Sequence, residues 1–264
     1  MSARRDIGKY AEQARSYDRT RGASPTLVRL LARFFGPPDH RVLLDIAGGT
    51  GNYGQAMRAR GFRVFVLDAE AAMLALSVRK LGPGRQVVGD ALALPIADAS
   101  VDCAMVVAAL HLVGARLRAM REARRVIRDG PFVLQDFTRE NLRPSFVYEY
   151  FPGSRPPERE HPTEDDTLRD LGNAGFSRVE TERFVYLDTA DANLQALHTD
   201  ALRLAGPAYL RNTSFFQRLP EESRREGLAR LAEDLRSGRL VERVRASFQE
   251  AVRTGHGTVF AGWP

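Results

Sequence analysis

Short apolar runs and amphipathic segments alternate regularly through the first half of the chain. Continuous apolar runs between turn residues are typical of buried parallel strands, and apolar residues every three or four positions are typical of helices. The expected strands are residues 41–46, 63–67, 86–88, 101–108 and 132–136. The expected helices are residues 25–35, 52–60, 70–80 and 117–128. Because helices alternate with strands through this region, we predict a right-handed, doubly wound sheet.

The pattern changes after residue 136. Residues 139–176 begin with prolines and aromatics and end in a helix over residues 164–174, for which Thr163 is a suitable N-cap. Two more strands are expected, at residues 177–187 and 258–262, with a leucine-rich helical block over about 190–250 between them. The whole pattern predicts an α/β, Rossmann-like, doubly wound sheet of seven mostly parallel strands.

The most informative motif is VLLDIAGGTGNYG, residues 42–54, where a predicted buried strand runs into glycines. Open α/β sheets bind ligands at such turns, at the carboxyl ends of their strands. Gly49 to Gly54 satisfy G-x-G-x-x-G, which alone is a weak indication of a dinucleotide. Asp45 favours S-adenosylmethionine (SAM), because its carboxylate would repel a pyrophosphate but suits an ammonium and a sulfonium. A structural alternative stays open, in which Asp45 caps the next helix or pairs with an arginine.

Four stretches together resemble the class I SAM-dependent methyltransferases of the bacterial small-molecule, UbiE-like type. LDIAGGTG, residues 44–51, resembles their first motif, with Ala47 where the family usually has glycine. We expect the extra methyl group to be tolerated if the dihedral angles of Ala47 are ordinary. GDALALPIADASVD, residues 89–102, resembles their third and fourth landmarks, and the Leu110-His111 pair is common after their fourth strand. The Tyr17-Asp18 element resembles part of a lid over the cofactor.

The resemblance implies a SAM site along the carboxyl ends of the first four strands. It places Asp45 at the methionine end, Asp68 at the ribose hydroxyls, and Asp90 with the Ala91 N–H at the adenine, against which Met73 lies. Asp68 would serve NAD equally well or cap the following helix, whereas a dinucleotide dehydrogenase has no need for Asp90. The expected cofactor-binding residues are Tyr17, Arg21, Asp45, Ala47, Gly48, Gly49, Gly51, Asp68, Ala69, Met73, Asp90, Ala91, Val107 and Ala108.

The candidate catalytic residues are His111, which would lie near the transferred methyl group, and Tyr17 of the lid. A histidine with a pKa near neutrality can take a proton from an acceptor hydroxyl. The alternatives are a structural histidine that supports its loop and a tyrosine that docks on the core. The expected substrate-lining residues are His111, Tyr148, Tyr150, Phe151, Tyr209 and Phe216, although aromatics at helical spacing are more often core residues.

The resemblance also completes the expected architecture. It implies that the last strand is antiparallel and inserts beside the fifth strand. It divides the chain into an N-terminal helical lid (residues 1–38), a SAM-binding core (39–138), a substrate-loop insertion with a helix (139–176), and the end of the sheet with a helical cap (177–264).

The composition argues against several other classes of protein. The chain of 264 residues has no apolar run long enough to span a membrane and no secretory signal pattern, so we expect a cytoplasmic protein. The single cysteine, Cys103, excludes a disulfide framework, and we expect no metal. The net charge is +6, but 37 of the 39 basic residues are arginine, with lysine only at Lys9 and Lys80. The arginines alternate with acids, and those at 116–128 fit a solvated helix face, which argues against nucleic acid.

The function favoured by these observations is in-line methyl transfer from SAM, yielding S-adenosylhomocysteine (SAH), to an O, N or C nucleophile of a small molecule. An RNA or protein methyltransferase is the first alternative, and a non-catalytic SAM-binding regulatory subunit is an alternative of another class. An NAD enzyme stands third. The oligomeric state, including a homo-oligomer with swapped N-terminal helices, stays open.

Overall fold

The computed structural model describes residues 17–142, 145–154, 161–206, 209–210, 213, 216 and 219–264. The first 16 residues of the helical lid expected over residues 1–38 therefore lie outside the described residues. Of that segment, residues 18–20 form a turn and Arg21 makes an isolated bridge with Asp191.

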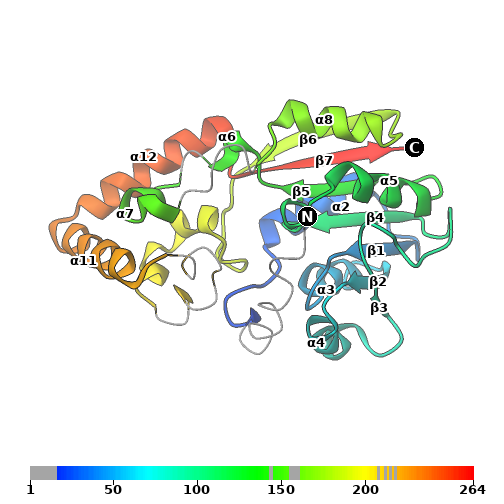
Figure 1. Ribbon diagram of the computed structural model, residues 1–264, viewed down its shortest axis with the longest axis horizontal. Helices are drawn as coiled ribbons and strands as arrows, with labels where there is room; N and C mark the ends of the chain where they lie inside the picture. The colour runs from blue at the N-terminus through cyan, green and yellow to red at the C-terminus, as the bar shows by residue number, and fades with distance from the viewer. Residues whose placement is uncertain are drawn as a thin grey trace.

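One seven-stranded sheet organises the molecule (Figure 1). The strand order is β3-β2-β1-β4-β5-β7-β6. β7 pairs antiparallel with both β5 and β6, so the other six strands all run parallel, as predicted. The strands are β1 (Val42–Ile46), β2 (Arg63–Asp68), β3 (Gln86–Val88), β4 (Cys103–Val107), β5 (Phe132–Asp136), β6 (Arg178–Phe184) and β7 (Gly257–Trp263).

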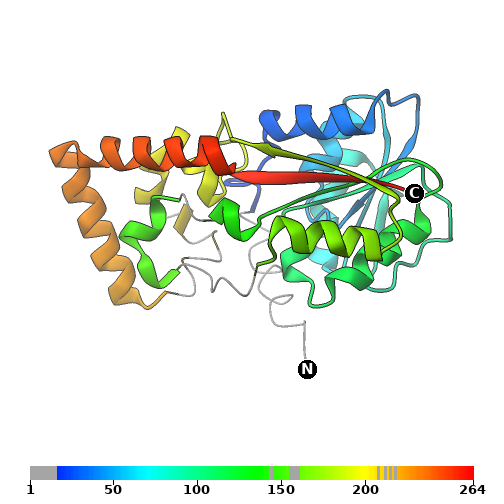
Figure 2. The same ribbon diagram turned by 90° about the horizontal axis from the view of Figure 1, so that it is seen from above.

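Helices cover both faces of the sheet (Figure 2). The apolar sides of α2 (Pro25–Phe35), α3 (Asn52–Arg58) and α4 (Ala71–Leu81) pack on one face. Those of α5 (Arg116–Val126) and α8 (Glu164–Asn173) pack on the other. The N-caps of α2 and α8 are Ser24 and Thr163, as the sequence predicted, and Thr163 forms a full capping box.

The arginines of α5 have a second role that the solvated-face interpretation did not include. Arg121 and Arg124 donate to the carbonyl oxygens of Asn173 and Gly175, at the end of α8 and just beyond it. Arg125 donates to the carbonyls of Leu94 and Ile96 and so holds the loop before β4. These side chains join neighbouring segments in addition to meeting solvent.

A helical cap extends from the edge of the sheet near β7 (Figure 1). Its own apolar core contains residues of α7 (Val147–Tyr150), η4 (Leu194–Thr199), η5 (Ala201–Ala205), α11 (Glu221–Ser237) and α12 (Arg239–Thr254). The short segments α6 (Arg139–Leu142) and η2 (Pro152–Ser154) flank α7, and η1 (Leu110–Leu112) follows β4. α12 leads directly into β7, so most of the cap is inserted between β6 and β7, while α7 joins it from the segment between β5 and α8.

The strand order reverses between β1 and β4. β1 pairs with β2 on one side and with β4 on the other, and Asp45 lies opposite Val66 and Met105. The connections leaving β1 and β4 therefore go to opposite faces of the sheet, which is the position where open α/β sheets bind ligands.

Candidate active site

The glycine turn after β1 has a backbone that favours glycine at defined positions. Gly49 and Gly51 have φ angles of 55° and 75°, in the left-handed region. Gly48 needs its small size instead: a Cβ there would lie 2.5 Å from Cγ of Asp45 and 2.8 Å from Cγ1 of Val66. The turn can lie this close to β1 and β2 because these positions lack side chains.

Two alanines beside the switch point adopt a conformation that alanine rarely takes. Ala47, directly after β1, has φ 55°, and Ala108, directly after β4, has φ 50°. The condition set for tolerating the extra methyl group of Ala47, ordinary dihedral angles, is therefore not met, and the positive φ explains why related motifs carry glycine there. Left-handed backbone costs an L-residue about 1–2 kcal/mol, and such strain concentrates at functional sites.

The carboxyl group of Asp45 lies beneath the turn. The residue is 1% exposed, and Oδ2 has no hydrogen-bond partner among the described residues. Burial raises its pKa to about 8, the charge of Asp68 adds to the rise, and a hydrogen bond from the Gly54 N–H opposes it. That bond reaches the first turn of α3, so the capping alternative describes part of its role. A cation bound above the turn would stabilise the ionised form.

Asp68 joins the end of β2 to the glycine turn. Its Oδ2 accepts from the Gly49 N–H at 2.9 Å and its Oδ1 from the Glu70 N–H at 2.8 Å. Burial raises its pKa, and these backbone bonds oppose the rise. The helix-cap alternative for Asp68 is wrong, because Glu70 caps α4. Met73 is buried one turn further on, and a Cβ at Gly49 would lie 3.3 Å from its Cε.

The acid expected at the adenine is open to solvent. Asp90, two residues after β3, is exposed, and its Oδ1 accepts from the Leu92 N–H at 2.9 Å. The neighbouring Ala69 is also exposed, and Ala91 and Val107 are half-buried. Thus Asp45 lies within β1, Asp68 ends β2 and Asp90 follows β3. These three acids, at or near the carboxyl ends of neighbouring strands, are in decreasing order of burial.

His111 is half of a hydrogen-bonded pair that the sequence did not reveal. Its Nδ1 lies 2.8 Å from Oδ1 of Asp136, the last residue of β5, and its backbone N–H donates to Oδ2 at 2.8 Å. Burial would raise the pKa of Asp136, yet the facing His111 ring and the Phe137 N–H hold it below its usual range. The rings of His161 and Phe137 lie beside His111. The carboxyl ends of β4 and β5 thus present an oriented imidazole.

Residues 17–21 connect the core to the cap. Arg21 pairs with Asp191 at 3.2 Å, and the Tyr53 hydroxyl of α3 donates to the same carboxylate at 3.0 Å. Burial alone would lower the pKa of Arg21, but Asp191 and the nearby Tyr17 and Tyr209 raise this pKa above its usual range. Tyr17 and Arg21, expected at the cofactor, therefore lie with Tyr209 at the junction between cap and core.

Most of the expected substrate-lining aromatics lie inside the cap. Tyr150, Phe151, Tyr209 and Phe216 belong to its apolar core and are at most 4% exposed. Tyr148 is buried to the same extent. Their packing matches the core interpretation that the sequence analysis set beside the substrate-lining one. Of the expected residues, His111 pairs with Asp136 at the sheet edge, and Tyr209 neighbours Arg21 of the N-terminal segment.

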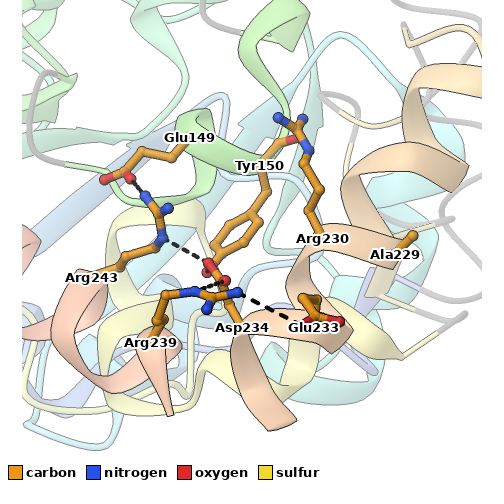
Figure 3. A pocket seen from close by; sticks show the side chains of 8 residues that line it. All are labelled: Glu149, Tyr150, Ala229, Arg230, Glu233, Asp234, Arg239 and Arg243. Atoms are coloured by element: carbon orange, nitrogen blue, oxygen red, sulfur yellow. Dashed lines mark hydrogen bonds and ion pairs between the residues drawn. The ribbon is translucent and has the colours of Figure 1, made fainter. Parts of the chain in front are cut away.

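A hollow of about 400 Å³ in the cap lies away from all of these groups (Figure 3). Its charged groups are paired with one another: Asp234 accepts from Tyr150, Arg239 and Arg243, and Arg243 also pairs with Glu149. Arg239 also pairs with Glu233, and Arg230 donates to the backbone oxygen of Tyr150. The hollow therefore offers few free charges to a ligand, and we do not place the active site there.

The described part of the chain contains neither a cluster of metal ligands nor a membrane-spanning helix. No three histidine, cysteine, aspartate or glutamate side chains gather there as metal ligands. No helix in the same residues is long and apolar enough to cross a bilayer.

Comparison with known families and curated sequences points to one class. Residues 44–134 match the family model described as a methyltransferase domain. The chain is 40% identical over 102 residues to the ubiquinone/menaquinone biosynthesis C-methyltransferase UbiE of Paracoccus denitrificans, covering 36% of this chain and 41% of the relative. A malonyl-[acyl-carrier protein] O-methyltransferase of Erwinia pyrifoliae is 32% identical, over 47% and 48% of the two chains. The chain spans less than half the length of these relatives.

Solved structures share the fold over longer stretches. A putative methyltransferase from an antibiotic biosynthesis pathway of Anabaena variabilis superposes with a TM-score of 0.78 at 23% identity, covering 93% of this chain and 99% of the other. A phosphoethanolamine N-methyltransferase of Haemonchus contortus in complex with SAH gives a TM-score of 0.63 at 16% identity, covering 100% and 60%. At such identities the similarity concerns the fold.

Proposed function

Because the core of this chain is a class I, SAM-dependent methyltransferase domain, we propose that the protein transfers a methyl group from SAM to a small-molecule acceptor. The observation that carries the proposal is the row of Asp45, Asp68 and Asp90 beside the glycine turn at the switch point. Three acids along this edge suit a cation with a ribose and an exocyclic amine. These acids do not suit a dinucleotide, because carboxylates would repel its pyrophosphate.

The donor groups of the site fit SAM residue by residue. Asp45 lies beneath the turn with its Oδ2 unpaired among the described residues, and a cation bound there would stabilise its ionised form against the burial that raises its pKa. Asp68 keeps lone pairs for ribose hydroxyls while its backbone bonds fix its position. Asp90, exposed and held by the Leu92 N–H, faces solvent where an adenine amine can donate to it.

SAM supplies an electrophilic methyl carbon, which an acceptor atom takes in line as the carbon–sulfur bond breaks. The chain must then orient the acceptor and receive its proton. Asp136 orients His111 through Nδ1, so Nε2 is the ring nitrogen that takes a proton from an acceptor hydroxyl. The ionised Asp136 stabilises the imidazolium that results. This arrangement favours an oxygen nucleophile, although the named relatives include a C- and an O-methyltransferase.

The test is calorimetric binding of SAM and SAH to Asp68→Ala and Asp90→Ala. Asp98→Ala is the matched control, because Asp98 is a 79% exposed acid on the loop after Asp90, paired only at the surface with Arg125. We expect affinity to fall at least tenfold in the first two variants, since each loses hydrogen bonds to the ligand. Equal binding by all three variants would contradict the proposed site. SAM binding without methyl transfer to any acceptor tested, and so without formation of SAH, would favour the regulatory-subunit alternative.

A further inference from the structure

Lys80 is at the centre of a polar cluster beside the glycine turn. Its Nζ lies 2.8 Å from Oδ2 of Asp18, 3.0 Å from Oγ1 of Thr50 and 2.6 Å from Oδ1 of Asn52. The side chain is 15% exposed and comes from the last turn of α4. An ammonium group has three N–H donors, and all three have an acceptor here.

The other members of the cluster are satisfied in turn. Oδ1 of Asp18 accepts from the Thr50 hydroxyl at 2.7 Å and from the Asn52 amide at 3.1 Å. The same amide donates to the backbone oxygen of Arg21 at 3.0 Å. Each group of the cluster therefore holds two or more of the others, and removal of the ammonium leaves three acceptors without a donor.

The chemistry of lysine explains its presence in a chain that otherwise uses arginine. Lysine occurs only at positions 9 and 80, against 37 arginines. A compact ammonium on a flexible stem can reach three acceptors that converge on one point, whereas the donors of a planar guanidinium diverge in a fixed fork. The three converging acceptors around position 80 therefore suit the ammonium of lysine.

The cluster joins three parts of the molecule that the chemistry needs together. Thr50 and Asn52 belong to the glycine turn and the start of α3, and Asp18 belongs to the N-terminal segment. Three residues after Asp18, Arg21 pairs with Asp191 of the segment leading to the cap. The Thr20 carbonyl also accepts from the Ala192 N–H at 3.2 Å. Residues 17–21 thus lie between turn and cap, and Lys80 fixes their end at the turn.

We propose that Lys80 is a positioning residue of the cofactor site, whose ammonium clamps residues 17–21 onto the glycine turn. The inference rests on the proposed function, since the turn is where the cofactor would bind. Lys80 itself touches no ligand in this account. It acts by holding Asp18, Thr50 and Asn52 in one arrangement, so that the turn is ordered before the cofactor arrives.

The experiment measures two properties of Lys80→Met, Lys80→Arg and the control Arg79→Met, which removes an exposed cation from the preceding position. The first is the affinity for SAH by calorimetry. The second, on ligand-free protein, is hydrogen exchange at the Thr20 and Arg21 amides, which both donate to the Tyr17 carbonyl. We expect both Lys80 variants to bind SAH about tenfold more weakly and to exchange faster at these amides, while Arg79→Met behaves as wild type.

A double variant separates the clamp from a general loss of stability. If the ammonium acts through Asp18, adding Asp18→Asn to Lys80→Met weakens SAH binding little further, because the contact is already lost. Additive losses, or a Lys80→Arg protein that binds and exchanges as wild type, would overturn the inference. Wild-type protein that binds neither SAM nor SAH would overturn the proposed function instead, and the exchange rates would still decide whether the clamp exists.

Discussion

The carboxyl edge of the sheet and the hollow of the cap differ in a way that separates function from structure. The sheet edge contains strained backbone at Ala47 and Ala108, a buried carboxyl group with a raised pKa at Asp45, and the His111–Asp136 pair. The cap contains a hollow of about 400 Å³, but the charges that line it are paired with each other.

From this difference we infer that unsatisfied or strained groups are better indicators of the proposed site than empty volume is. Paired charges such as Asp234 with Arg239 and Arg243 stabilise the cap and leave nothing for a ligand. At the sheet edge, by contrast, Oδ2 of Asp45 lacks a partner among the described residues. An unpaired buried oxygen destabilises the fold unless a bound ligand interacts with it. Four predictions test this contrast, from the largest expected effect to the smallest.

Replacing the imidazole should have the largest effect. We expect His111→Ala to lower kcat for an oxygen acceptor by about 10²–10⁴, the usual contribution of a general base. SAH affinity should stay near that of wild type, because His111 follows β4 and is not one of the acids of the cofactor row at β1, β2 and β3. Methyl transfer from labelled SAM measures the rate. Unchanged kcat in His111→Ala would show that the pair with Asp136 is structural.

Two glycine substitutions compare the regions directly. A Cβ at Gly48 would lie 2.5 Å from Cγ of Asp45, and one at Gly227 would lie 2.2 Å from Cε1 of Phe151 inside the cap. Both Gly48→Ala and Gly227→Ala should lower the free energy of unfolding by about 1–3 kcal/mol, the usual cost of overpacking. Only Gly48→Ala should abolish SAM binding. Equal loss of binding in both variants would remove the distinction between the regions.

Two aspartates should have opposite effects on stability as the pH changes. Burial raises the pKa of Asp45 to about 8, so the folded state binds its proton more tightly and wild-type stability falls as the pH rises from about 4 to 8. The Arg239 hydrogen bond holds the pKa of Asp234 below its usual range, so its contribution is present above about pH 4 and is lost at lower pH.

Melting temperatures of Asp45→Asn and Asp234→Asn across pH 3–9 measure both effects. Relative to wild type, Asp45→Asn should gain stability as the pH rises towards 8. Asp234→Asn should lose most at neutral pH and approach wild type in acid. Parallel curves for the two variants would contradict the difference in environment.

The smallest effect concerns the left-handed alanine. Ala47→Gly should raise the free energy of unfolding by about 1 kcal/mol, because it relieves the strain of φ 55° at some cost in chain entropy. The control Ala75→Gly, at an exposed position inside α4, should lower it by about 1 kcal/mol. Chemical denaturation measures both. A loss in Ala47→Gly would mean that the methyl group packs more favourably than its backbone is strained.

The parts of the fold that local pattern controls were predictable from the sequence. All five strands β1 to β5 were predicted to within two residues at either end. β1, β4 and β5 are nearly continuous apolar runs because parallel strands inside a sheet are buried on both faces. Asp68 and Asp90 were found because they follow such runs directly. The rows of acids and glycines near the strand ends are short-range features, so they are visible in sequence.

The features that the sequence analysis did not predict depend on contacts between residues far apart in the chain. Asp136 is 25 residues from His111, and Lys80 is 62 residues from Asp18, so neither pairing leaves a local pattern. The aromatics Tyr150 and Phe151 have the same spacing whether they line a substrate site or fill the cap. The positive φ of Ala47 is a property of the folded backbone, although glycine at that position in similar motifs could have indicated it.

The most direct test of the central claim is a calorimetric titration of the wild-type protein with SAM and, separately, with NADH. The claim is that the turn at the β1–β4 switch point, with Asp45 beneath it, binds a cationic nucleoside and not a dinucleotide. We predict micromolar binding of SAM and no heat of binding when NADH is titrated. Binding of NADH without SAM would contradict it, because Asp45 and Asp90 would then face a pyrophosphate and have no partner.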